Sequence, residues 1–205
     1  MINTIIFDIG NVLMKFDFFP MLNRLFEAQS VRDAIVDTFF TSGNWNQLDL
    51  GLAEEEEFLQ AAIRTSPELE KEIRRTFEHI PETLVKEEFA APWILDLKKR
   101  GYRVLFLSNY SRPVMKMGPQ ALEFLPLMEG GVFSCDVHLC KPDPAIYKAL
   151  KDKYELDFST CVFLDDTLPN LEAANAQGLR TIHVQNHEQA AKELEQLLAE
   201  EGIAG

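Results

Sequence analysis

Six polar residues of this sequence stand at or just beyond the end of an apolar run, and together they have the functional groups that phosphate chemistry needs. They are three carboxylates, a hydroxyl, an amide and an ammonium: Asp8, Asp165, Asp166, Ser108, Asn109 and Lys141. Three carboxylates brought together raise one another's pKa values unless a hard cation neutralises them. Oxygen ligands of this kind suit Mg²⁺, which commonly completes its shell with phosphate oxygens of a substrate. The set therefore predicts magnesium-dependent phosphoryl transfer.

Each residue of the set has a chemical role in such a reaction. Asp8 is the candidate nucleophile, which would form an acyl-phosphate that water then hydrolyses. Ser108 and Asn109 would donate hydrogen bonds to phosphate oxygens, and Lys141 would add a positive charge. Taken singly, these residues are as well explained as turn formers, helix caps or loop residues. Their convergence on one edge of one sheet is what favours a shared function.

The elements that position these residues are short runs that are apolar throughout, as in strands buried on both faces of a parallel sheet. The runs cover Asn3–Asp8, Tyr102–Ser108, Cys161–Asp165, Arg180–Val184 and, more weakly, Gly131–Ser134. Helical patterns such as Trp93–Arg100 and Ala145–Lys153 alternate with them. This alternation predicts an α/β fold with a Rossmann-like three-layer core and a mostly parallel sheet. Ligands of such sheets bind beyond the carboxyl ends of the strands, where the six polar residues lie.

The segment 18–89 has a different pattern. It shows no strand-like run between Phe18 and Phe89, and its apolar residues recur at helical spacing. We therefore predict a small helical cap over residues 18–89 and a core made of residues 1–17 and 90–205. Within the cap, Glu54–Glu57 are expected in the first turn of a helix, where the helix dipole favours acids, instead of in a metal site. Trp45 is expected to pack within the cap, with stacking on a sugar as the alternative.

The composition limits the possible partners and the compartment. A net charge of −13, from 33 acidic and 20 basic residues, disfavours nucleic acids and anionic membranes. The three cysteines have no paired spacing and are expected to be reduced thiols: Cys135, Cys140 and Cys161. No apolar run approaches the roughly 20 residues of a membrane span, and no leader sequence is recognised. We expect a cytoplasmic monomer that binds a small phosphorylated metabolite.

Four segments resemble, in order, the motifs of the haloacid dehalogenase (HAD) superfamily. They are Phe7–Leu13, Leu107–Asn109, Cys140–Tyr147 and Phe163–Asn170. The resemblance spans nearly the whole chain, and the helical region between the first and second motifs corresponds to the cap of the early-cap subfamily. The first motif is most similar to that of small bacterial sugar-phosphate phosphatases, which carry Asp-x-Gly-Asn-Val there.

The resemblance implies a role for each motif residue. Asp8 would be nucleophile and metal ligand, and the backbone carbonyl of Gly10 would be a second ligand. Asp166 would complete the protein's share of the Mg²⁺ shell, with Asp165 acting directly or through water. Ser108 and Asn109 would hold the transferring phosphoryl group, and Lys141 would orient Asp8. Sugar phosphates are the preferred substrates, while nucleotides and small phospho-acids stay open.

The sequence departs from the commonest phosphatase pattern at Gly10. Most phosphatases of this superfamily have there a second aspartate, the general acid and base, whose contribution is typically about 10²- to 10⁴-fold. Asp17 is a candidate substitute because it follows closely on the cap side, although a turn or capping role explains it equally well. A substrate with a good leaving group, such as an anomeric sugar phosphate, would depend less on an acid.

Two other functions compete with the phosphatase hypothesis. A 2-haloacid dehalogenase also lacks the second aspartate, but it has no use for the metal site that Asp165 and Asp166 would build. A catalytically weakened HAD-like binding protein would explain the loss at Gly10, but it would not need Asp8 and Lys141. Magnesium-dependent phosphate release separates the phosphatase from the dehalogenase, and capture of beryllium fluoride that depends on Asp8 separates it from an inert binding protein.

Overall fold

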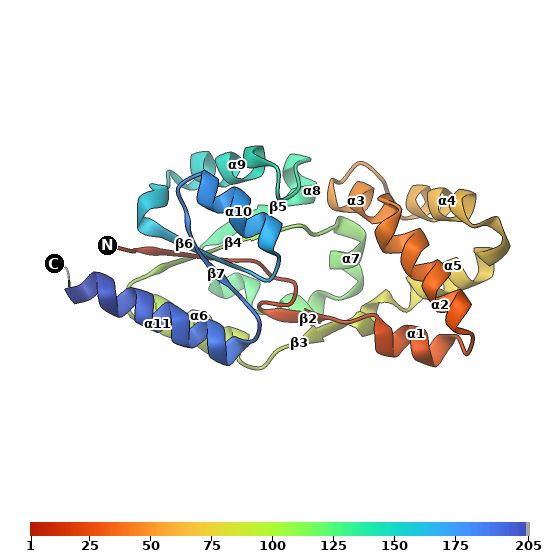
Figure 1. Cartoon of the computed structure of the whole chain (residues 1–205), viewed down its shortest axis with the longest axis horizontal. Coiled ribbons are helices and arrows are strands. Elements are labelled where there is room, and N and C mark those ends of the chain that lie inside the picture. The colour runs from red at the N-terminus through yellow and green to blue at the C-terminus, as the bar shows by residue number, and fades with distance from the viewer. Residues whose placement is uncertain (204–205) are drawn as a thin grey trace.

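The computed structural model of the chain, which describes residues 1–203, is built on a five-stranded sheet with helices on both faces (Figure 1). The strands lie in the order β5-β4-β1-β6-β7, and every neighbouring pair is parallel. Their bounds are Thr4–Phe7 for β1, Arg103–Ser108 for β4, Gly130–Phe133 for β5, Cys161–Asp165 for β6 and Arg180–His183 for β7. All five predicted strands are present, and the central position of β1 places its carboxyl end in the middle of the sheet edge.

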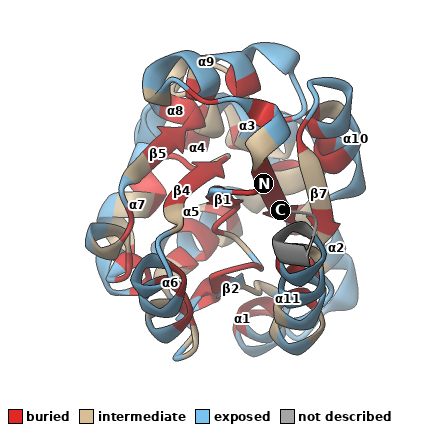
Figure 2. Cartoon of the chain, turned by 90° about the vertical axis from the view of Figure 1, so that its left-hand side faces the viewer, coloured by how far each residue is buried: buried red, intermediate tan, exposed pale blue. Residues whose placement is uncertain are grey.

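The sheet is buried on both faces, which explains why its strands are apolar throughout. Ile6 on β1 packs with the residues of α9 (Pro144–Tyr154) and α10 (Leu168–Ala176). Its neighbours Ile5 and Phe7 point to the other face, toward α6 (Ala90–Lys99) and α11 (His187–Ile203). Figure 2 shows the two helical layers above and below the buried strands. The predicted three-layer α/β core is confirmed.

A helical cap lies beyond the carboxyl ends of the strands, at the right of Figure 1. Its helices are α1 (Phe19–Leu25), α2 (Gln29–Val36), a π-helical turn (Asp37–Thr41), α3 (Asn44–Asp49), α4 (Glu55–Thr65) and α5 (Glu70–Glu78). The rings of Phe39, Phe40, Phe58 and Trp45 pack together inside it. The Glu54–Glu57 run opens α4, and the Glu57 carboxylate accepts the Glu54 N–H at 3.0 Å, as expected for a helix start.

The expectation that no strand occurs between Phe18 and Phe89 is wrong. A short strand, β3 (Leu84–Lys86), pairs antiparallel with β2 (Met14–Phe16), and this ribbon joins the cap to the core. Each strand has only three residues, so neither is long enough to show an alternating pattern. The two strands of the ribbon are separated by some 70 residues of sequence, so no local pattern reveals their pairing.

Two short helices follow strands at the carboxyl edge of the sheet, α7 (Arg112–Met117) after β4 and α8 (Ser134–Val137) after β5. Short 3₁₀ turns occur elsewhere in the chain. The three cysteines are free thiols, as expected. Within residues 1–203, no helix combines the length and the apolar character required to cross a membrane.

Candidate active site

A cavity of about 190 Å³ lies between the carboxyl ends of the strands and the cap. Core residues after β1, β4 and β6 form its floor, and the ribbon and the cap supply the rest of its wall. The lining residues are Asp8, Gly10, Asn11, Met14, Phe16, Trp45, Asp49, Leu84, Asn109, Tyr110, Ser111, Val114, Asp166 and Thr167. The cavity therefore joins one strongly polar surface to one largely apolar surface.

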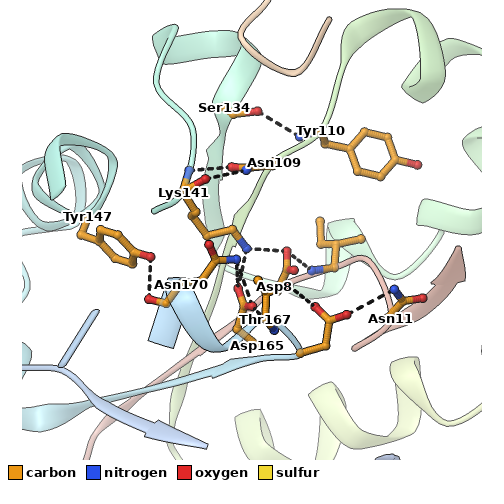
Figure 3. A network of polar contacts seen from close by, with 12 residues as sticks. Asp8, Asn11, Asn109, Tyr110, Ser134, Lys141, Tyr147, Asp165, Thr167 and Asn170 are labelled. Atoms are coloured by element: carbon orange, nitrogen blue, oxygen red, sulfur yellow. Dashed lines mark hydrogen bonds and ion pairs between the residues drawn. The ribbon is translucent and has the colours of Figure 1, made fainter. Parts of the chain in front are cut away.

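Asp8 follows directly on β1 and is 8% exposed. Its Oδ1 accepts the backbone N–H of Ile9 at 2.7 Å and lies 2.9 Å from Nζ of Lys141 (Figure 3). Burial raises the pKa of Asp8 to about 6, and the charge of Asp165 adds to the rise, whereas Lys141 and a hydrogen bond from Ser108 oppose it. The carboxylate is thus ionised near neutral pH and has one oxygen, Oδ2, that neither Ile9 nor Lys141 engages.

Lys141 bridges two of the three clustered carboxylates. Its ammonium lies 2.9 Å from Asp8 and 2.7 Å from Oδ2 of Asp165, and the side chain is almost completely buried. Burial disfavours the ammonium, but the charges of Asp8 and Asp165 outweigh this cost and raise the pKa of Lys141. Lys141 therefore stays charged and offsets the negative charge of the nucleophile.

Asp165 at the end of β6 is the most enclosed of the carboxylates. Besides Lys141, it accepts the backbone N–H of Thr167 at 2.8 Å and the amide of Asn170 at 3.1 Å on both oxygens. The Asn170 carbonyl in turn accepts the Tyr147 hydroxyl at 2.8 Å. Both oxygens of Asp165 are thus occupied, which suits a residue that orients the site more than one that binds a cation directly.

Asp166, by contrast, faces the cavity. Its Oδ2 accepts the Asn11 amide at 3.2 Å, and its backbone carbonyl accepts Nε2–H of His183 at 3.0 Å. Gly10 lies beside it, with open space where a side chain would begin. One oxygen from each of Asp8, Asp165 and Asp166 lies within 4.8 Å of the others, a spacing that one metal ion could span. The donor set is oxygen only, which fits Mg²⁺.

The second-motif residues occupy different positions. Ser108, at the end of β4, is buried, and its hydroxyl acts to lower the pKa of Asp8. The Asn109 side chain lines the cavity but also clasps the backbone of Lys141, accepting its N–H at 2.8 Å and donating to its carbonyl at 3.0 Å. This clasp fixes Lys141 across two strands. Contact of Ser108 and Asn109 with a phosphoryl group stays a prediction.

Asp17 does not line the cavity. Its carboxylate accepts the Phe19 N–H at 3.2 Å, at the start of α1, and pairs with Lys15 at 3.3 Å. These contacts match the capping alternative, and an acid–base role for Asp17 stays a prediction that no contact supports.

Sequence reasoning missed several residues of the site. The lining residues without a predicted role include Asn11, Asp49, Tyr110, Ser111 and Thr167. Asn11 had a local signal, since it follows Gly10 in a turn and has a left-handed backbone, a conformation that asparagine tolerates. Asp49 had none, because it ends a cap helix far from the motifs. Trp45 packs in the cap as expected and also lines the cavity.

Comparison with known proteins agrees with this geometry. A family model described as haloacid dehalogenase-like hydrolase matches residues 2–178. The chain belongs to the haloacid dehalogenase-like hydrolases. Among curated relatives, mouse acyl-CoA dehydrogenase family member 10 is 30% identical over 95% of this chain, which spans only 19% of that protein. The sesquiterpene phosphatase astK of Aspergillus oryzae is 25% identical over 94% of this chain and 95% of its own length.

Solved structures of HAD proteins share the fold. A predicted HAD-like family hydrolase from Porphyromonas gingivalis has a TM-score of 0.76 and 25% identity, covering 97% of this chain and 98% of that one. A HAD family enzyme from Bacteroides thetaiotaomicron, in complex with magnesium and inorganic phosphate, has a TM-score of 0.71 and 22% identity over 90% and 95%. A dehalogenase has a TM-score of 0.65 and 19% identity over 90% and 87%. At such identities the last two show the fold alone.

Proposed function

We propose that this HAD hydrolase is a magnesium-dependent phosphate monoester hydrolase that acts through an aspartyl-phosphate on Asp8. One observation carries the proposal: the Asp8 carboxylate lies 2.9 Å from the Lys141 ammonium and within 4.8 Å of oxygens of both Asp165 and Asp166. A dehalogenase has no need of a cation site next to its nucleophile. The cap, inserted between the first two motifs, would place the chain in the early-cap subfamily with an Asp-x-Gly-Asn-Val first motif.

The residues of the site divide the work between them. Lys141 and the Ile9 N–H hold Oδ1 of Asp8, so Oδ2 is the oxygen we assign to attack on phosphorus. The fixed carboxylate lowers the entropic cost of reaching an in-line geometry. Ser108 and Asn109 stay the residues that we propose to hold the phosphate oxygens, and Ser111, which lines the cavity beside Asn109, has a further donor. The products of this step are an acyl-phosphate on Asp8 and the leaving alcohol.

The oxygen donors fit a magnesium ion. Asp8, Asp166 and the backbone carbonyl of Gly10 would bind it. Asp165 would act through water because it is fully buried and Lys141, Thr167 and Asn170 already engage its oxygens, whereas Asp166 lines the cavity. When bound, Mg²⁺ neutralises charge on the phosphate oxygens in the transition state. Asn11 keeps Asp166 directed toward this position through its amide.

The cap side of the cavity favours a leaving group that has an apolar face. Phe16, Trp45 and Leu84 form this wall, with Trp45 and Phe16 rings 6.0 Å apart. A small sugar phosphate can present a ring face to Trp45, and it stays the preferred substrate. A more apolar alcohol is the alternative, in keeping with the sesquiterpene phosphatase among the relatives. A cytoplasmic location and a monomeric state are retained from the sequence prediction.

The test is phosphate release from a broad panel of phosphate esters, with and without Mg²⁺, by wild type and Asp8→Asn. We expect metal-dependent release that falls by at least about 10⁴-fold in the variant, since no other group replaces the nucleophile. Retention of beryllium fluoride by wild type and not by Asp8→Asn would report the acyl-phosphate site independently of turnover. Equal activity of the two proteins would overturn the proposal. Halide release from 2-haloacids without metal would establish the dehalogenase instead.

A further inference from the structure

One carboxylate in the cavity comes from the cap. Asp49 is the last residue of α3 and lines the same cavity as Asp8 and Asp166. Asp8 and Asp166 have partners in the core, Lys141 and Asn11 respectively. Among residues 1–203, no hydrogen bond or ion pair engages the side chain of Asp49. A carboxyl group without a partner among the described residues, in the wall of the cavity that contains Asp8, is available to give and to take a proton.

The backbone around Asp49 is fixed to the core. The Ser134 hydroxyl donates to the Asp49 carbonyl at 2.5 Å and accepts the Tyr110 N–H at 3.0 Å. Next along the chain, the Leu50 carbonyl accepts Nδ1–H of His138 at 2.8 Å. These contacts tie the end of α3 to the segments that follow β4 and β5, so the position of the Asp49 carboxyl is determined by the core and not by the cap alone.

Gly51 allows the chain that follows Asp49 to approach the backbone of the core closely. Its φ of +65° is left-handed, and a Cβ added there would come within 2.6 Å of the Cys135 carbonyl oxygen. Only glycine therefore lets the chain turn directly after Asp49 while lying against the core backbone. The three consecutive residues 49–51 form one contact surface between cap and core.

The surroundings of Asp49 raise the pKa of its carboxyl group toward neutral pH. Burial raises the pKa of its carboxyl to about 7, the charge of Asp8 adds to the rise, and Lys141 opposes it. The other titratable groups near it are Tyr110, Cys140 and Asp166. Burial and the Asp49 charge hold the pKa of Tyr110 well above its ordinary value, so Tyr110 is a poor proton donor. Both forms of Asp49 are populated near neutral pH, as a group that acts as acid and then as base requires.

Building on the proposed phosphatase reaction, we propose that Asp49 is its general acid and base, supplied by the cap in place of the side chain that Gly10 lacks. In the first step Oδ2 of Asp8 bonds to phosphorus and the ester P–O bond breaks. The leaving oxygen takes the Asp49 proton and departs as an alcohol. In the second step a water oxygen bonds to phosphorus, Asp49 takes a water proton, and the bond from phosphorus to Asp8 breaks. Both carboxyl groups return to their starting forms, and the net reaction is hydrolysis.

The experiment compares kcat/KM of wild type and Asp49→Asn with Mg²⁺ on two esters, an alkyl phosphate and p-nitrophenyl phosphate. Nitrophenolate leaves without a proton, so kcat/KM for this ester should fall by less than about tenfold, whereas the alkyl ester should lose at least about 100-fold. Loss of the base should also slow the second step, giving a burst of nitrophenolate close to one per active site. The alkaline limb of the wild-type pH profile for the alkyl ester should disappear in the variant.

The control is Asp37→Asn, which neutralises an exposed aspartate of the cap and should change neither ester. Equal losses of Asp49→Asn on both esters, or no loss on either, would overturn the role of Asp49. These results differ from failure of the phosphatase proposal, in which wild type itself shows no metal-dependent release that needs Asp8. A melting temperature of Asp49→Asn close to that of wild type would show that the losses do not arise from unfolding.

Discussion

The two surfaces that enclose the cavity are built on opposite principles. On the core side, each of the clustered carboxylates has fixed partners, and Lys141 joins two of them within 2.9 Å. On the cap side, rings and aliphatic side chains such as Phe16, Trp45 and Leu84 dominate, and the carboxyl group of Asp49 has no partner among the side chains that the structure describes. The core surface is thus a rigid charged frame, and the cap surface is apolar with a single titratable group.

This difference separates two tasks of a hydrolase. The phosphoryl group is the same in every substrate of the class, so the residues that meet it can be fixed by strands and by mutual hydrogen bonds. The leaving group varies, and the residues that meet it come from an inserted segment that can change without disturbing the sheet. If Asp49 protonates the leaving oxygen, the proton donor belongs to the inserted segment that meets the leaving group, and not to the core residues that meet the phosphoryl group.

The largest effect should follow from removing the cation of the core frame. Lys141→Met leaves the carboxylates of Asp8 and Asp165 buried without the ammonium that neutralises them. This change should lower the free energy of unfolding by about 3–5 kcal/mol at pH 8, and it should also abolish activity. The loss should shrink near pH 5, where protonation of Asp8 relieves the repulsion. Urea denaturation at both pH values measures this. Lys148→Met, which removes an exposed lysine paired with Asp152, is the matched control and should cost under about 0.5 kcal/mol.

The next largest effect should follow from moving the proton donor from the cap surface, at Asp49, to the core surface, at position 10. Gly10 lines the cavity, and a Cβ there meets nothing within 4 Å. Gly10→Asp in the Asp49→Asn background should therefore restore kcat/KM for the alkyl phosphate by about 10- to 100-fold. Gly10→Asn in the same background fills the space without an ionisable group and should restore nothing. Equal recovery with Gly10→Asn and Gly10→Asp would mean that a side chain at position 10 acts by filling space and not by donating a proton. This result would contradict the assignment of the lost activity to a missing general acid.

A smaller effect should follow from altering the apolar wall. Trp45→Ala removes an aromatic surface from the cavity and should raise KM by roughly tenfold for an ester with a ring, while leaving methyl phosphate nearly unaffected. Phe19→Ala serves as control, since Phe19 is a largely exposed cap aromatic that does not line the cavity. The same rise in KM for both esters would show that Trp45 shapes the cap without contacting the leaving group.

The smallest effect concerns stability and pH. The carboxyl of Asp49 has a pKa of about 7 in the folded chain against an ordinary 3.8, so the folded state binds this proton more tightly. Ionising it costs folded stability as the pH rises from about 4 through 7. Metal-free Asp49→Asn should therefore match wild type near pH 4 and exceed it by roughly 1 kcal/mol at pH 8. A constant difference across this range would contradict the raised pKa.

The sequence predicts the core surface better than the cap surface, for physical reasons. Strands buried on both faces are continuous apolar runs, so the positions of Asp8, Ser108 and Asp165 at strand ends follow from local patterns and from the parallel sheet. The β2–β3 ribbon escapes such reasoning because three-residue strands carry no periodic signal.

The partners of the site residues are harder to predict. Asn170 reaches Asp165 from one turn into α10, and Asp49 reaches the cavity only because the end of α3 is docked on Ser134. The position of Asp49 depends on contacts between segments far apart in the chain, whereas the Asn170 contact, only five residues from Asp165, depends on how the chain turns from β6 into α10. Amino-acid type and spacing encode neither. Asp17 shows how little sequence proximity says about a side chain: it is close to Asp8 in the sequence, but its carboxylate contacts Lys15 and the Phe19 N–H and does not line the cavity.

The close approach of Gly51 to Cys135 has a consequence for the order of events in a catalytic cycle. The backbone that packs there is continuous with Asp49, so any movement that separates cap from core breaks the Ser134 and His138 hydrogen bonds and withdraws the carboxyl group at the same time. An open enzyme would admit substrate but have no proton to offer, and a closed one would have both. With Asp49 in its proposed role, substrate enclosure and readiness for bond cleavage would coincide in one closed conformation, so that the ester would not be cut before it is fully bound.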